Sequence, residues 1–204
     1  MKRFILCCVC MVWLLTGCDK TFNNDMRNIE ERDYATVLMV HQNMDTQYHY
    51  DIGIAKEKTD GENRKNEEIS GFDCDSLEEL KDIYEKVKGK DLSLAHLKVI
   101  LVTKTEPLLE LEPCLEQMRN SKEIAKTVPV LFVEDERAFL EFTKAEDTSV
   151  GTYLNNLVKV NERDGKKIPW LKDYLKAVHE GDAVMIYELQ FEDEGIQLVC
   201  KNLG

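Results

Sequence analysis

The side chains most able to do chemistry in this 204-residue chain are its four histidines and seven cysteines. A metal site or an acid–base pair needs such groups close together, with carboxylates that orient them. His41 and His49 could meet across a short hairpin and form a weak metal site, but neither has a nearby carboxylate pattern to orient it. His96 and His179 are isolated in the sequence. We therefore predict that the histidines are hydrogen-bonded or solvent-facing and that the chain holds no metal.

The common catalytic motifs are absent from the sequence. There is no G-x-S-x-G elbow, no glycine-rich phosphate loop and no H-E-x-x-H, and no C-x-x-C occurs after residue 17. Acidic clusters such as EDE at 192–194 are expected from composition alone and are explained by a solvated surface. We therefore predict no catalytic residues and no enzymatic activity.

Cys18 differs from the other cysteines because it follows a short apolar run. Two basic residues precede the apolar stretch 4–15, which has signal-peptide length and is too short for a spanning helix of about 20 residues. The stretch ends in LTGC (15–18), the order of a bacterial lipobox. This resemblance implies a lipoprotein signal peptide over 1–17 and a diacylglyceryl lipid on the thiol, with no other cofactor. The alternative is a plain secreted protein, or an uncleaved anchor, in which Cys18 is incidental.

Three cysteines remain beyond Cys18, namely Cys74, Cys114 and Cys200. An odd count of three does not build a disulfide framework, and none has a histidine at metal-ligand spacing. We predict that they are small, buried, apolar side chains.

The charge of the chain limits its partners. Without Lys2 and Arg3, 25 basic side chains face 39 acidic ones, so the part after the signal carries a formal charge of about −14. Nucleic acid and anionic lipid surfaces both require a basic patch. We expect no nucleic-acid partner, and we expect attachment to the lipid bilayer through acyl chains alone.

Hydrophobic patterning predicts the elements that follow a polar tether at 18–32. A hairpin is indicated by YATVLMVH and YHYDIGIA, then a charged loop at 56–68, a third strand in EISGFDC and a helix capped by Ser76 and Glu79. The continuous apolar run 99–102 predicts a strand covered on both faces, and 128–135 repeats that pattern.

The remaining elements alternate helix and strand before a final hairpin. Pro113 marks the start of a helix, another begins near Glu134, two more lie near 150–158 and 168–178, and a terminal hairpin flanks EDE. The predicted order is β-β-β-α-β-α-β-α-α-α-β-β. We predict an α+β (mixed α/β) body over 33–204, with helices packed against a mixed sheet.

Several stretches together resemble a known family. LSLAHLKVILVT (92–103) is similar to a segment in the N-terminal region of spore germination receptor C-subunit lipoproteins, the Ger(x)C family. LEPCLEQMR (111–119), VLFVED (130–135) and VGTYLNNLVK (150–159) follow in the family's order. LAHLKVI is the most specific part of the match.

This resemblance implies a non-enzymatic C-type subunit of a nutrient germinant receptor. Its partners would be integral-membrane A-type and B-type subunits, and its location the extracytoplasmic face of the cell membrane, or the inner membrane of a spore, in a Gram-positive bacterium. Independently of this resemblance, a purely structural role is open for His96, in which its ring hydrogen-bonds backbone at the entry to the central strand and fixes the preceding turn.

Two other classes remain open. A solute-binding or adaptor lipoprotein of a transporter or envelope complex would have two lobes around a cleft. A surface hydrolase would need a recognisable nucleophile and base.

Overall fold

The computed structural model describes residues 31–42, 47–55, 67–103, 111–146, 148–182, 184–192 and 195–203. The chain divides into two units, Met1–Arg32 and Asp33–Gly204, and apart from Arg32 the elements described below lie in the second. The lipobox, Cys18, most of the predicted tether and most of the predicted charged loop lie outside the described residues.

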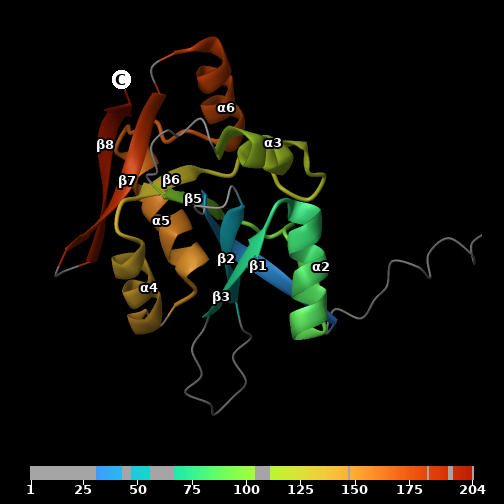
Figure 1. Cartoon of the computed structure of the whole chain (residues 1–204). Helices are drawn as coiled ribbons and strands as arrows, with labels where there is room; N and C mark the ends of the chain where they lie inside the picture. The colour runs from blue at the N-terminus through green and yellow to red at the C-terminus, as the bar shows by residue number, and fades with distance from the viewer. Residues whose placement is uncertain are drawn as a thin grey trace, which may run out of the picture. The chain divides into compact units, whose positions relative to one another are not determined.

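One mixed sheet organises the body (Figure 1). Its strand order is β3-β2-β1-β5-β6-β7-β8, and β4 is added beside β1. The neighbours β1, β5, β6 and β7 run parallel, whereas β1/β2, β2/β3 and β7/β8 pair antiparallel. The strands are β1 (Arg32–Gln42), β2 (Tyr48–Ala55), β3 (Glu67–Cys74), β4 (Asp91–Ser93), β5 (Val99–Thr103), β6 (Val130–Val133), β7 (Val184–Glu192) and β8 (Gly195–Leu203).

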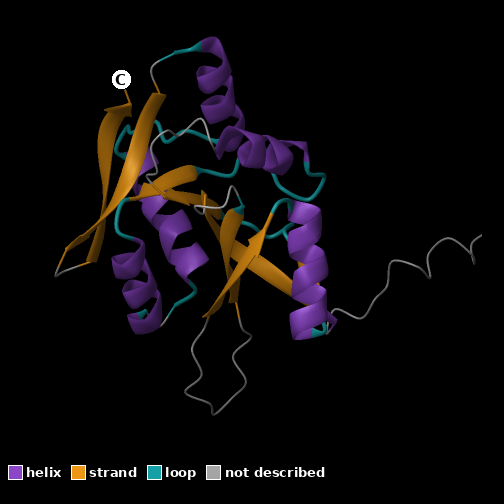
Figure 2. Cartoon of the chain, in the orientation of Figure 1, coloured by secondary structure: helices purple, strands orange, loops and turns teal. Residues whose placement is uncertain are grey.

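Helices cover both faces of the sheet (Figure 2). The helices are α2 (Leu77–Lys88), α3 (Glu112–Asn120), α4 (Glu136–Ala145), α5 (Val150–Arg163) and α6 (Leu171–Glu180). One apolar core lies between the sheet and α2, α3 and α6, and the other lies between the sheet and α4 and α5. The predicted α+β fold class is confirmed.

The central strand behaves as its apolar run predicts. All five residues of β5 are buried, because β1 and β6 pair with its edges and a helix layer covers each face. Leu101 contributes to one core and Ile100 to the other, as expected from side chains that alternate across a strand.

Helix α2 is the clearest local prediction. The Ser76 side chain accepts a hydrogen bond from the Glu79 backbone N–H at 3.1 Å, and the Glu79 carboxylate accepts one from the Asp75 N–H at 2.9 Å. The helix ends at Gly89, which has a φ of 69° and therefore suits a residue without a Cβ. The predicted capping box and stop are confirmed, although the returning bond reaches Asp75 instead of the cap residue itself.

Three predicted details are wrong. β4 was not expected, because three residues carry too little periodicity to stand out. β3 starts at Glu67, two residues inside the predicted loop. The last helix starts at Leu171 instead of 168, because Pro169 lies in an extended segment: its carbonyl accepts a hydrogen bond from the Val130 N–H at 3.0 Å.

The cysteine prediction holds for two of three residues. Cys74 and Cys114 are buried, and burial raises the pKa of both thiols to about 12. The Tyr50 hydroxyl lies 3.1 Å from the Cys114 sulfur. Cys200 is exposed instead, although it lies on the same face of β8 as the buried Leu198.

A buried carboxylate joins β3 to α5. Glu67 is 8% exposed and accepts hydrogen bonds from the Thr36 hydroxyl at 2.6 Å and from the backbone N–H groups of Val150 and Gly151. Ser149 precedes α5 but makes no capping bond with its side chain. Glu67 therefore supplies the negative charge and the acceptors that the first turn of α5 needs.

Candidate functional site: a histidine–carboxylate cluster

The first hairpin brings two histidines together. In the β1/β2 register His41 lies opposite His49, and their rings stack with centroids 4.8 Å apart. This meeting across the hairpin is confirmed. It takes place on the face that Met39 and Val37 share with α4 and α5, because residues two apart on a strand point the same way.

Carboxylates from two neighbouring strands surround His49. Its Nδ1 lies 2.7 Å from Asp73 Oδ1 on β3, and its Nε2 lies 3.5 Å from Asp51 Oδ1 on β2. Burial alone would lower the pKa of His49, but the hydrogen bond to Asp73 and the charges of Asp51 and Asp73 outweigh it, so the pKa is raised. The predicted lack of orienting carboxylates is therefore wrong.

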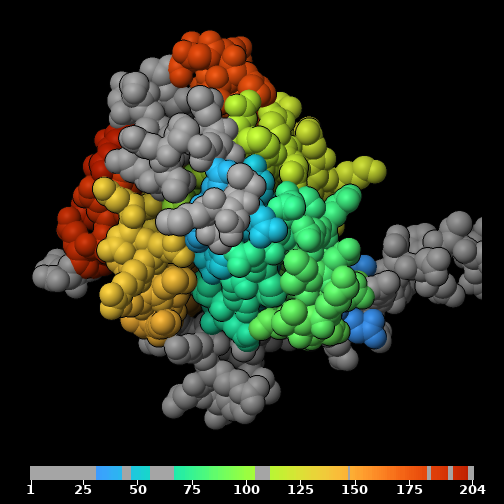
Figure 3. Space-filling view, in the orientation of Figure 1, coloured from blue at the N-terminus to red at the C-terminus, as the bar shows by residue number. Residues whose placement is uncertain are grey.

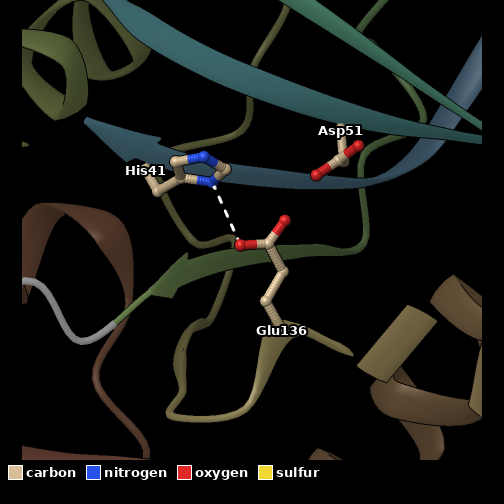
Figure 4. A group of neighbouring side chains, drawn as sticks. All are labelled: His41, Asp51 and Glu136. Atoms are coloured by element: carbon tan, nitrogen blue, oxygen red, sulfur yellow. Dashed lines mark ion pairs between the residues drawn. The ribbon is translucent and has the colours of Figure 1, made fainter. Parts of the chain in front are cut away.

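A third carboxylate reaches the cluster from α4. Asp135 caps this helix by accepting the Ala138 N–H at 2.8 Å, which sets Glu136 as its first residue. Glu136 Oε2 then lies 3.6 Å from His41 Nδ1. Figure 4 shows the side chains of His41, Asp51 and Glu136 converging on one space from different elements.

Two atoms of this group are buried without a hydrogen-bond partner among the described residues. They are His41 Nδ1 and Asp51 Oδ2. Asp51 is only 7% exposed, so water replaces little of the missing bonding. No lysine or arginine of the described chain forms an ion pair with Asp51 or Glu136.

Gly71 provides the room for this arrangement. It lies opposite Asp51 in the β2/β3 register. A Cβ at this position would come within 2.6 Å of His49 Nε2 and 2.9 Å of Asp51 Oδ1, which is closer than real Cβ atoms approach. In the space-filling view, β2 and β3 reach the surface between α2 and α4 (Figure 3).

The other histidines lie apart from this cluster. His179 Nε2 on α6 is 2.7 Å from Glu112 Oε1 on α3, where it links two helices. His96 is exposed, and its ring packs edge-on against Tyr34 with centroids 4.7 Å apart. No hydrogen bond of this ring is found in the described part of the chain, so its predicted bond to the backbone is wrong.

The segment around His96 has a structural role. Leu94 and Leu97 are buried, and the Lys98 N–H donates to the Thr36 carbonyl at 2.8 Å. The Lys98 ammonium donates to Thr152 Oγ1 at 2.7 Å. The stretch LAHLKVI thus connects β1, β5 and α5 through buried side chains and hydrogen bonds.

Membrane attachment by a helix is not seen in the described residues. None of their helices is long and apolar enough to cross a bilayer. Cys18, the predicted lipid-attachment residue, lies outside the described residues.

A mixed sheet covered by helices on both faces defines an α+β protein, and a comparison with family models specifies which kind. The model described as the spore germination protein N-terminal domain matches residues 25–187, which is 163 of the 204 residues. The chain therefore belongs to this family of spore germination proteins, as LAHLKVI predicts. No curated protein and no solved structure gives a significant match. Membership of this family supports a role like that of a germinant receptor C subunit.

Proposed function

We propose that the protein is the lipid-anchored C-type subunit of a nutrient germinant receptor. It acts without catalysis, by contact with integral-membrane A-type and B-type subunits. The observation that carries this proposal is the family match over 25–187. The LTGC lipobox supports the anchor, since it stands directly before the polar segment that leads to β1.

Tethering explains how such contacts become effective. Two acyl chains on Cys18 hold a protein firmly on a bilayer, at roughly 0.8 kcal/mol for each buried methylene. A body held close to its partners has a raised effective concentration, so contacts that are weak individually are sufficient. The protein then lies on the extracytoplasmic face of the membrane, which in a spore is the inner membrane.

Co-purification from spore membranes tests this assembly. The protein, solubilised in mild detergent and captured through an affinity tag, should bring down multi-span receptor subunits identified by mass spectrometry. Another tagged lipoprotein of the same spores serves as the control and should not recover them. Recovery of a transporter permease instead would favour the adaptor function, and recovery without any integral-membrane partner would contradict the receptor assembly.

A further inference from the structure

His41, Asp51 and Glu136 form a cluster in which two carboxylates face one imidazole. Acidic groups are therefore in excess at this site. Buried charges are normally paired, hydrogen-bonded or bound to a metal. No lysine or arginine of the described chain forms an ion pair with Asp51 or Glu136, and Asp51 Oδ2 is buried without a hydrogen-bond partner.

We propose that His41, Asp51 and Glu136 bind a divalent transition-metal cation such as Zn²⁺. One ligand atom of each residue lies within 4.8 Å of the others. Two ligands that are each about 2.1 Å from a tetrahedral Zn²⁺ lie about 3.4 Å apart. The 3.6 Å between His41 Nδ1 and Glu136 Oε2 already has this spacing. The other separations are at most 4.8 Å, so small rotations of the three side chains would bring them to this spacing.

His49 and Asp73 act as positioning residues in this site. The Asp73 carboxylate holds His49 Nδ1 at 2.7 Å, which turns Nε2 toward Asp51 Oδ1. The other oxygen of Asp51 stays available for the cation. Residues that orient a metal ligand in this way contribute on the order of 10- to 100-fold to metal affinity.

The donor set selects the class of cation. Mg²⁺ and Ca²⁺ prefer oxygen ligands alone, whereas an imidazole nitrogen with carboxylates suits Zn²⁺ and its neighbours among the transition metals. A surface hollow of about 480 Å³, lined in part by Glu136, lies along α4. The three ligands come from β1, β2 and α4. A bound cation would therefore link α4 to the β1/β2 hairpin.

A titration with Co²⁺, a spectroscopic substitute for Zn²⁺, tests the site. The full chain is purified in detergent without a histidine tag, in a Cys200→Ser background that removes the exposed thiol. We expect visible d–d absorption that saturates with bound Co²⁺ and is displaced by Zn²⁺ but not by Mg²⁺. His41→Asn and Glu136→Gln should each weaken binding by on the order of tenfold or more.

Matched substitutions away from the cluster serve as controls. His96→Asn removes an exposed histidine, and Glu141→Gln removes an exposed carboxylate on the same helix as Glu136. Both should bind Co²⁺ as the parent does. Circular dichroism checks that each variant is folded, and Zn²⁺ should raise the thermal midpoint of the unsubstituted chain by mass action.

Two results would overturn the site. One is a parent chain that shows neither saturable Co²⁺ absorption nor a Zn²⁺-dependent thermal midpoint. The other is binding that persists unchanged in folded His41→Asn and Glu136→Gln variants. Either result would leave the cluster as an ion-pair network of imidazoles and carboxylates only. Neither depends on receptor assembly, so failure here is distinguishable from failure of the proposed function.

Discussion

At the scale of single residues, Glu67 shows how one buried carboxylate can hold two parts of a fold together. It accepts the Thr36 hydroxyl and the first N–H groups of α5, and so replaces the N-cap that Ser149 does not supply. A buried charge that accepts several hydrogen bonds stabilises a fold only while its partners stay in place.

We predict that Glu67→Gln lowers the free energy of unfolding by about 2 kcal/mol, since hydrogen bonds to a charged group contribute more than those to a neutral amide. Urea denaturation measures this loss. The adjacent Glu68→Gln is the matched control, because Glu68 pairs with Lys88 at the surface and should change stability by less than about 1 kcal/mol. Equal losses in the two variants would show that Glu67 does not cap α5.

The sequence predicts only part of the candidate site. The hairpin signals allow His41 and His49 to be placed across from each other, and the alternation in YHYDIGIA puts Asp51 on the same face as His49. Asp73 and Glu136 could not be found this way. Their approach depends on the register of β3 and on the docking of α4, and neither is encoded in short-range spacing.

At the scale of elements, α5 and β1 approach each other closely. Gly151 lies in the first turn of α5, and a Cβ there would come within 2.6 Å of Thr36 Oγ1 and 2.7 Å of the Thr36 carbonyl oxygen. The Thr36 carbonyl also accepts a hydrogen bond from the Lys98 N–H. A shift of β1 away from α5 would therefore break this hydrogen bond.

We predict that Gly151→Ala lowers the free energy of unfolding by about 2 kcal/mol, as expected from overpacking. The same change on an open helix surface would stabilise by up to about 1 kcal/mol, so the sign of the effect is diagnostic. Asn156→Ala, on the exposed side of the same helix, is the control and should be neutral or stabilising. A stabilised Gly151→Ala protein would contradict the tight contact.

Most elements follow from local pattern, and the exceptions have physical reasons. Caps, apolar runs and hairpin signals predict α2, β5 and the two hairpins because those signals act within a few residues. β4 exists because it pairs with β1, and the start of α6 is delayed by pairing of the Pro169 segment with Val130. Both effects are tertiary and leave no periodicity in the sequence.

At the scale of the whole molecule, the negative charge of the chain disfavours contact with an anionic membrane, whereas the proposed lipid favours membrane attachment. A formal charge of about −14 over residues 18–204 makes electrostatic docking on anionic lipid unfavourable. In the proposed function, membrane residence rests on the lipid attached to the thiol of Cys18.

We predict that Cys18→Ser releases the protein from the membrane or leaves an unprocessed precursor, because serine has no thiol to form the thioether. Carbonate washing followed by fractionation measures the bound share. Cys200→Ser is the control, since this exposed thiol lies in β8 and its loss should leave attachment unchanged. A Cys18→Ser protein as tightly bound as the parent would show that the anchor lies elsewhere.

The cap that Glu67 provides for α5 also bears on how the chain assembles over time. Glu67 and Val150 are 83 positions apart, so the first turn of the helix gains its acceptor only after β3 has joined the sheet. Contacts between distant positions form late, because a long loop must close before they bring any benefit. β3 is synthesised before α5, so we expect the contact of Glu67 with the first turn of α5 to form late in folding, when the long loop between them closes.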